Sequence, residues 1–308
     1  MTWIIIALIG HAANGFAFVI DKILLKNAFK RSATYAGMVG LLSGLAIVLI
    51  PWVTSWPIGV DILWAILCGI TFMAALWTFF AALSRGEASR VVPIISALIP
   101  IMTLVGTYSF LGERLSYQQL IGFALLIIAT ILLAGGKAQS RLTKATIFLC
   151  VLSALMFAVS SISGKAVYDS AGFLGGFVTT RIVAAATALI LACLIDPMSG
   201  AEMLSIIRAH KGKKKGEVIS GSSAAKLAIV GQVLGGIGFI LLQYAISLGS
   251  ASIVNALQVM QFALLVIVAF VLKSKAQTLL GESLKRNVIA LKAVALAVMA
   301  VGLAMISL

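Results

Sequence analysis

The chain consists of long apolar runs separated by short polar connections. The runs are about 20 residues long and recur along nearly the whole length, and a helix needs this length to cross a hydrocarbon core of about 30 Å. A membrane β-barrel would instead show alternating segments of about ten residues. We therefore predict an all-α integral membrane protein with ten transmembrane helices. Their expected ranges are 3–22, 34–52, 61–83, 88–110, 117–135, 145–166, 172–195, 227–247, 251–272 and 289–307.

The composition agrees with a membrane protein. Of the 308 residues, 62% are hydrophobic and only 10% are charged, whereas a soluble protein carries about 25% charged residues. The net charge is +14, but a basic patch without a binding motif is a weak sign of nucleic-acid binding. We expect the lipid bilayer as a partner and no nucleic acid.

The basic residues indicate an orientation. The odd-numbered connections between the expected helices hold 19 of the 23 Lys and Arg residues, and cytoplasmic loops are the ones that collect these residues. We expect a multi-pass protein of the cell (inner) membrane with both termini outside. The longest loop, 196–226, would be cytoplasmic, and its stretch Ala201–His210 is weakly amphipathic and would lie on a surface.

A motif occurs twice, about half a chain apart. Residues 82–89, Ala-Leu-Ser-Arg-Gly-Glu-Ala-Ser, lead through an apolar run to Leu-Gly-Glu at 111–113. Residues 245–252 lead through another run to Leu-Gly-Glu at 280–282. Such self-similarity predicts two repeats, 1–140 and 141–308. Because each would hold five helices, an odd number, the second repeat would be inverted relative to the first.

These residues resemble a known family. Residues 81–135, with the motif, a helix bearing two prolines and Leu-Gly-Glu-Arg-Leu-Ser, are similar to the repeat of the EamA-type drug/metabolite transporter superfamily. Residues 244–304 resemble its second copy, with alanines at the two proline positions. The resemblance implies a ten-span transporter of small molecules rather than an enzyme, and export is the family's tendency.

One arginine is expected deep in the membrane. Arg181 lies about nine residues into the seventh helix, roughly 13 Å deep, and no Asp or Glu is expected at comparable depth. A substrate carboxylate or phosphate could engage it through two hydrogen bonds. The alternative is a structural arginine that reaches Glu113, Asp169 or free carbonyls at the surface. Lys165 and Asp169 are spaced for an ion pair within one helix.

Two helices carry polar stripes. His11 and Asn14 share a face of the first helix, and Asn255, Gln258 and Gln261 share a face of the ninth. Histidine is the deep residue able to titrate near neutral pH, so His11 is either a packing residue or a proton carrier. Three amides on one helix exceed what packing usually requires, which favours substrate contacts for Asn255 and Gln258.

The third and fourth helices add further candidates. Trp77 could stack on a substrate or lie in an aromatic belt, and Ser96 lies beside the two prolines. Pro93 and Pro100 each remove a backbone donor, which predicts either a gating hinge or a static kink. Three scattered cysteines and the absence of catalytic or ligand spacing indicate no metal site, no cofactor and no catalytic residues.

The sequence therefore predicts a transporter of a small organic metabolite that works by alternating access. Arg181 and the lack of deep acids favour an anionic or zwitterionic substrate, such as an amino acid or a phosphorylated compound. The alternative is a lipid-handling protein or enzyme that binds a lipid phosphate through Arg181 and Lys165. The sequence leaves open whether the protein is a monomer or a homodimer.

Overall fold

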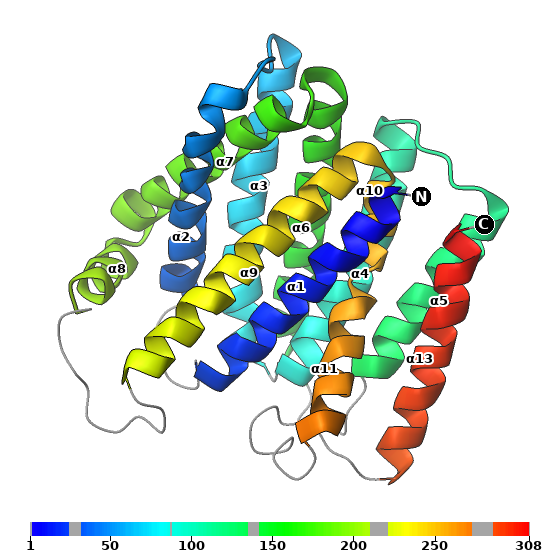
Figure 1. Ribbon diagram of the computed structural model, residues 1–308. Helices are drawn as coiled ribbons and strands as arrows, with labels where there is room; N and C mark the ends of the chain where they lie inside the picture. Colours follow the sequence, from blue (N-terminus) through cyan, green and yellow to red (C-terminus); the bar gives the residue numbers. More distant parts are fainter. Residues whose placement is uncertain are drawn as a thin grey trace. The chain divides into compact units, whose positions relative to one another are not determined.

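The computed structural model describes residues 2–24, 32–86, 88–134, 142–209, 221–272 and 286–307 (Figure 1). Every regular element in these ranges is helical, which confirms the all-α prediction. The chain divides into two compact units. Unit 1 comprises Met1–Ala28, Arg114–Lys137 and Lys213–Leu308, and unit 2 comprises Phe29–Glu113 and Ala138–Gly212. Each unit combines segments from both predicted repeats, and the inverted relation of the repeats stays a prediction.

Unit 2 is a helical bundle around α3. Helix α3 packs against α2, α4, α6 and α7, and α4 also packs against α6. The helices are α2 (Ser32–Ser43), α3 (Val60–Leu83), α4 (Ala88–Phe110), α6 (Lys144–Ala171), α7 (Phe173–Ile190) and α8 (Pro197–Ala209). A core of small and branched apolar side chains joins α3, α4 and α6, with Ala82, Ile95 and Cys150 among its members.

Unit 1 is built from two helix pairs and a divided helix. Helix α1 packs along α9, and α5 packs along α13 (Figure 1). The helices are α1 (Thr2–Leu24), α5 (Tyr117–Ala134), α9 (Gly221–Leu248), α10 (Ala251–Ala256), α11 (Val259–Leu272) and α13 (Arg286–Ser307). Glycines allow close approach: a Cβ added to Gly238 of α9 would collide with Gly10 and Asn14 of α1. Gly122 of α5 and Gly302 of α13 meet in the same way, as small residues do where membrane helices touch.

The apolar helices follow the predicted spans. In the described part of the chain, seven segments are long and apolar enough to cross a membrane, which supports a multi-pass membrane protein. They are 60–83, 90–110, 144–171, 173–195, 230–248, 251–268 and 289–307. Three shorter apolar helices, Thr2–Ala17, Ala36–Trp52 and Tyr117–Leu133, correspond to the first, second and fifth predicted spans. The count of ten spans stays a prediction, because seven segments of the described residues meet the length and hydropathy of a full span.

Three predicted spans are not regular α-helices throughout. The second continues from α2 as a 3₁₀ helix, Gly44–Trp52, which contains Pro51. The seventh ends in a π-helical turn, Leu191–Ile195. The ninth is divided between α10 and α11. Most of the basic connections lie outside the described residues, so the orientation in the membrane stays a prediction.

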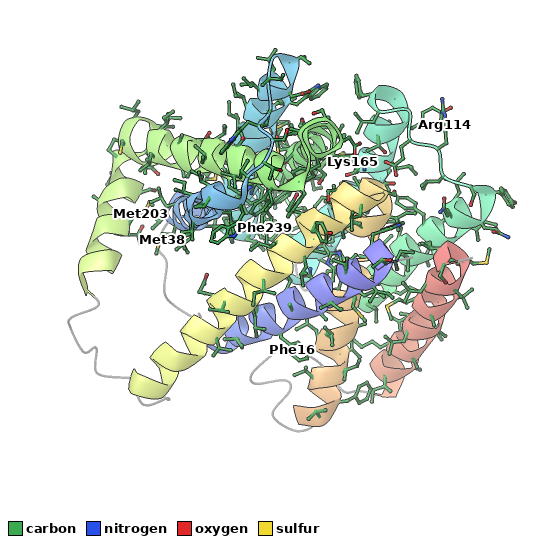
Figure 2. All side chains as sticks on the ribbon, turned by 45° about the horizontal axis from the view of Figure 1, so that its top comes forward. Phe16, Met38, Arg114, Lys165, Met203 and Phe239 are labelled. Carbon is green, nitrogen blue, oxygen red and sulfur yellow. The ribbon has the colours of Figure 1, made fainter. Side chains whose placement is uncertain are left out.

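The predicted amphipathic stretch of the long loop belongs to α8. Its first turn is capped by Asp196, whose carboxylate accepts hydrogen bonds from the Ser199 amide at 3.3 Å and hydroxyl at 2.6 Å. Helix α8 then packs on α2, where the Thr34 hydroxyl donates to Glu202 at 2.7 Å. Met203 is buried at this contact, near Met38 (Figure 2). His210, the end of the predicted stretch, lies outside the described residues.

The repeated Leu-Gly-Glu motif has a structural reason in its first copy. Gly112 ends α4 with a φ of 67°, a left-handed conformation that glycine adopts without steric cost. The amides of Leu111 and Glu113 both donate to the carbonyl of Thr107, at 3.0 and 3.1 Å. The glycine therefore terminates the helix in the way that αL residues commonly do. The second copy lies outside the described residues.

Candidate functional site

A tight turn determines how α7 begins. Gly172 joins α6 to α7 with a φ of 77°, and its amide donates to the carbonyl of Tyr168 at 3.0 Å. The turn brings the Phe173 ring to within 5.6 Å of the Tyr168 ring, centroid to centroid. The first turns of α7 are therefore held against the end of α6.

Close packing then sets the distance between α3 and α7. Gly69 of α3 lies against Val183 of α7, so closely that a Cβ on Gly69 would be 2.6 Å from a Val183 methyl group. Cys68 and Phe72 are one turn apart on α3 and share a face. Both side chains contact α7 at Arg181.

Arg181 is the largest fully buried side chain among the described residues, at 1% exposure. Its guanidinium carbon lies 4.4 Å from the centroid of the Phe72 ring and 5.9 Å from that of Phe177. Its Nη2 is 3.9 Å from the sulfur of Cys68. These three contacts are with neutral groups, and aromatic faces attract a cation without removing its charge.

Helix α6 completes this cluster. The Ser160 hydroxyl donates to the Cys68 carbonyl at 3.0 Å, and its oxygen is 3.6 Å from the Cys68 sulfur. Phe157 packs edge to face on Phe72, with 6.3 Å between the ring centroids. We name Cys68, Phe72, Ser160, Phe177 and Arg181 the arginine cluster. In this cluster the positive charge of Arg181 is buried among neutral side chains.

The other two predicted site residues of unit 2 lie on other helix faces. Trp77 is five residues beyond Phe72 on α3, which is about 140° around the helix, and 37% of its surface is exposed. Ser96 is buried in α4 at 4% exposure, next to Ile95 of the core that joins α4 to α6. Their contacts with a substrate stay a prediction.

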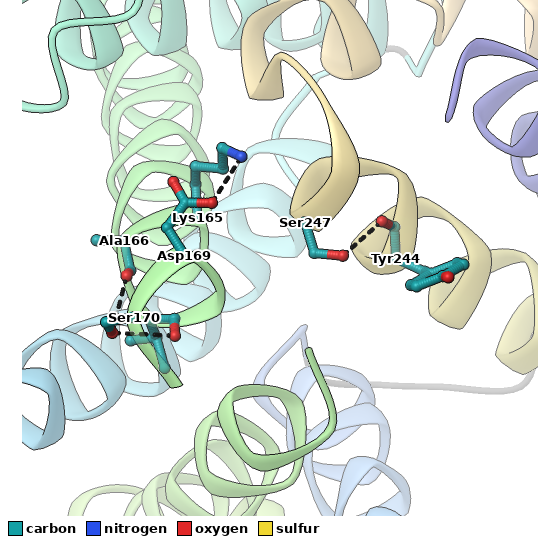
Figure 3. Close-up of polar contacts among 7 residues, drawn as sticks. Lys165, Ala166, Asp169, Ser170, Tyr244 and Ser247 are labelled. Atoms are coloured by element: carbon teal, nitrogen blue, oxygen red, sulfur yellow. Dashed lines mark hydrogen bonds and ion pairs between the residues drawn. The ribbon is translucent and has the colours of Figure 1, made fainter. Parts of the chain in front are cut away.

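Asp169 and Glu113, the surface partners suggested for Arg181, have the following surroundings. Lys165 donates to Asp169 at 2.8 Å (Figure 3), which confirms the ion pair expected within one helix. Both carboxylate oxygens of Glu113 are buried and accept no hydrogen bond within the described part of the chain. The ion pair with Asp169 means that Lys165 already has a partner on its own helix.

In unit 1, His11 connects three helices. It is 4% exposed, and its Nε2 lies 2.8 Å from the carbonyl oxygen of Val254 at the end of α10. Its Nδ1 lies 3.0 Å from the side-chain nitrogen of Gln261 on α11. Both ring nitrogens are therefore used within the protein.

The remaining candidates of unit 1 surround the same region. Asn255 is the penultimate residue of α10, and Gln258 lies in the turn before α11. Both are partly exposed. Asn14 is one turn beyond His11 on α1 and faces Gly238 of α9, so it contributes to close packing there. Whether these residues also touch a substrate stays a prediction.

The two prolines do not interrupt their helix. Helix α4 runs without a break from Ala88 to Phe110 through Pro93 and Pro100. A kink or hinge can exist inside a helix that stays hydrogen-bonded elsewhere. The gating role of the two prolines therefore stays a prediction.

Sequence reasoning overlooked several residues of these sites. Cys68 and Phe72 look like ordinary core residues in the sequence, and only their one-turn spacing on a helix facing Arg181 distinguishes them. The sequence places Gln261 on the polar stripe of the ninth helix but does not indicate its contact with His11. Lys292 is buried at 5% exposure in α13, two turns inside the helix, and a charge at that depth is a signal that the sequence already contains.

Comparison with known proteins agrees with this membrane architecture. Residues 1–135 match the model of the EamA-like transporter family. This part of the chain, somewhat less than half of it, is therefore similar to that family. No curated protein sequence matches the chain.

A solved structure shares the fold. A protein of known crystal structure superposes with a TM-score of 0.65 at 15% identity, and the match covers 98% of each chain. At this identity the likeness concerns the fold alone. EamA-like proteins are transporters, and the match over residues 1–135 suggests a membrane transporter of small molecules.

Proposed function

We propose that the protein moves a small organic anion or zwitterion across the inner membrane, and that the arginine cluster binds the anionic group. The EamA-like match supports transport of small molecules. The observation that carries the choice of substrate class is the guanidinium of Arg181, which is 1% exposed and lies about 12 Å along α7 from its first residue.

The neighbours of Arg181 suit an anion site. A buried cation attracts a carboxylate or phosphate strongly because little water screens the charges. The planar guanidinium can donate two parallel hydrogen bonds to either group. Its contacts with Phe72 and Cys68 fix its position, and neither of these groups carries a negative charge.

The helices around the cluster supply few competing acids. Helix α7 contains no Asp or Glu, and α3 contains only Asp61, in its first turn. Helix α6 contains Asp169, which accepts from Lys165 at 2.8 Å. The helices α3, α6 and α7 thus have no carboxylate near their middles. A substrate with an anionic group would supply the negative charge there.

The remaining assignments are part of the same proposal. In unit 2, Trp77 and Ser96 are further candidates for substrate contact. In unit 1, the candidates are Asn14, Asn255 and Gln258, which lie near His11, whose two ring nitrogens are bonded within the protein. Transport would proceed by alternating access with export as its direction, and Pro93 and Pro100 would serve as a hinge of α4. We propose no cofactor, and the functional state is a monomer or a homodimer.

Transport by purified protein in liposomes tests the role of Arg181. Liposomes loaded with labelled amino acids or sugar phosphates should release label when they contain the wild-type protein. Arg181→Leu should abolish release, and Arg181→Lys should reduce it because a lysine keeps the charge but loses the planar pair of donors. Lys165→Met, which removes a positive charge elsewhere in unit 2, is the matched control and should transport normally.

Protection of a cysteine tests whether the substrate reaches the cluster. Cys68 lies beside the guanidinium, and Cys150 is equally buried in the apolar core of α4 and α6. A transported anion should slow the reaction of Cys68 with a small thiol reagent and leave Cys150 unaffected. Full transport by Arg181→Leu, or equal protection of both thiols, would refute the assignment.

The same liposomes address the lipid-handling alternative. That function requires Arg181 and Lys165 to hold one phosphate together, whereas Lys165 is bound to Asp169. Chemical change or movement of lipid head groups without release of the labelled solute would favour the alternative.

A further inference from the structure

The division between α10 and α11 lacks the usual sequence cause. Sharp breaks in helices normally occur at proline or glycine, and the stretch Ala251–Leu272 contains neither. The backbone nevertheless changes its pattern. The amide of Gln258 donates to the carbonyl of Asn255 at 3.2 Å, three residues back, and those of Met260 and Gln261 do the same to Leu257 and Gln258, at 3.0 and 2.9 Å.

His11 takes the carbonyl that this change releases. In a continuous α-helix the amide of Gln258 would donate to the carbonyl of Val254, four residues back. That carbonyl instead lies 2.8 Å from Nε2 of His11. Because a carbonyl oxygen only accepts, Nε2 must carry the hydrogen. A side chain 243 residues away in sequence thus replaces a backbone donor.

The second ring nitrogen defines the charge state that fits. With the hydrogen on Nε2, the neutral ring has an acceptor at Nδ1, and this atom is 3.0 Å from the side-chain nitrogen of Gln261. A doubly protonated ring would place its second N–H against the NH₂ group of Gln261. The bond could then form only after the Gln261 amide turns over.

The surroundings also favour a neutral ring. Helix α1 packs against α9 and α11, and His11 reaches α10 through Val254. Across 2–17 of α1, 230–248 of α9, and the described side chains of α10 and α11, the sequence has no Asp, Glu, Lys or Arg. The other titratable group in these ranges is the phenol of Tyr244, which is 38% exposed.

We propose that His11 is a positioning residue that keeps α10 and α11 divided, and that the division is a hinge of the transport cycle. The neutral ring holds the end of α10 by a donated hydrogen bond and the start of α11 by an accepted one. Asn255 lies at one side of the division and Gln258 at the other. They keep their positions only while His11 is bonded to both Val254 and Gln261. The hinge role rests on the proposed transport function, whereas the holding role of His11 does not.

Reactivity of a thiol at the division tests the holding role directly. In a Cys193→Ser background, Gln258→Cys places a reporter in the turn, and Cys150, which is fully buried in unit 2, reports general loosening. Adding His11→Leu should raise the labelling rate of the reporter about tenfold, which corresponds to about 1.4 kcal/mol. The rate at Cys150 should not change.

Two further variants separate positioning from packing. His11→Gln keeps one donor and one acceptor and should restore a labelling rate near that of wild type. Thr130→Val removes another buried polar group of unit 1, one whose hydroxyl donates within its own helix to Leu126 at 2.9 Å, and should leave the rate within about twofold of wild type. An unchanged rate in His11→Leu, an equal rise at Cys150, or a failure of His11→Gln to restore the rate would overturn the proposal.

Transport by His11→Leu and His11→Gln with Gln258 left intact tests the hinge role. His11→Leu should lose solute release from liposomes and His11→Gln should retain it. If labelling behaves as expected while His11→Leu still transports at the wild-type rate, His11 holds the division but the division is no hinge. If wild type releases no solute, the proposed function fails and the labelling result stands by itself.

Discussion

Two buried glycines of unit 2 offer a matched test of the packing around Arg181. A Cβ added to Gly69 of α3 would lie 2.6 Å from a Val183 methyl group and 2.8 Å from the backbone nitrogen of Ala184. A Cβ added to Gly164 of α6 would lie 3.4 Å from the sulfur of Cys68, an ordinary contact. Both glycines are buried inside helices, so the helix-forming gain from alanine is the same in each.

The expected stabilities follow from two opposing effects. Replacing a helical glycine by alanine stabilises by about 0.5–1 kcal/mol. In Gly69→Ala the backbone of α7 must move away by about 0.6 Å to restore a 3.4 Å contact, and such overpacking costs about 1–3 kcal/mol. We therefore expect Gly69→Ala to destabilise by up to about 2.5 kcal/mol and Gly164→Ala to stabilise by about 0.5–1 kcal/mol.

Thermal unfolding of the purified variants measures this difference. In domains of about 150–250 residues, 1 kcal/mol changes Tm by about 2–4 °C. Gly69→Ala should therefore melt up to about 10 °C below wild type, and Gly164→Ala about 1–4 °C above it. Transport should fall in Gly69→Ala because the shift moves α7, and with it Arg181, away from Cys68 and Phe72. A Gly69→Ala protein as stable as Gly164→Ala, or more stable, would refute the close approach of α3 and α7.

Two smaller effects are expected elsewhere in unit 2. Asp169→Asn breaks the ion pair with Lys165, but Asp169 is half exposed, so the free energy of unfolding should change by less than about 1 kcal/mol in denaturant titrations; a loss above about 2 kcal/mol would contradict a surface pair. Ser153→Ala removes a buried hydroxyl of α6 that donates to the Ala75 carbonyl of α3 at 3.1 Å, and should cost about 0.6–1.5 kcal/mol. The Ser170 hydroxyl donates within α6, so Ser170→Ala should lose less stability than Ser153→Ala. A larger loss in Ser170→Ala would show that the hydrogen bond between α6 and α3 contributes nothing.

The positions of the apolar helices could be predicted because their cause is local. A stretch such as 60–83 must be apolar along its whole length to lie in hydrocarbon, and its backbone bonds close within the helix. Residues far apart in sequence are not needed to locate it. The depth of Arg181 in α7 could be predicted for the same reason, since it depends only on counting residues from the helix start.

The neighbours of these residues could not be predicted, because they come from other helices. Phe72 is one of 15 phenylalanines in the chain, and nothing near it in sequence indicates that its ring faces Arg181. That contact depends on Gly69, which lets α3 approach α7, and on the Gly172 turn, which orients α7. Glycines carry little signal in a chain that contains 28 of them.

The same distinction explains why the division of the ninth span does not show in the sequence. Pro93 lacks an amide hydrogen, which predicts a kink or hinge in α4, and α4 continues through it. Removing one donor leaves the neighbouring backbone bonds intact. In the ninth span every residue has its amide, but the Val254 carbonyl receives its hydrogen bond from His11. A helix is divided when an outside group satisfies one of its carbonyls and the next amides turn to nearer acceptors. A competing donor can therefore divide a membrane helix as effectively as a missing one, and such a donor becomes visible only once α1 is packed beside α10 and α11.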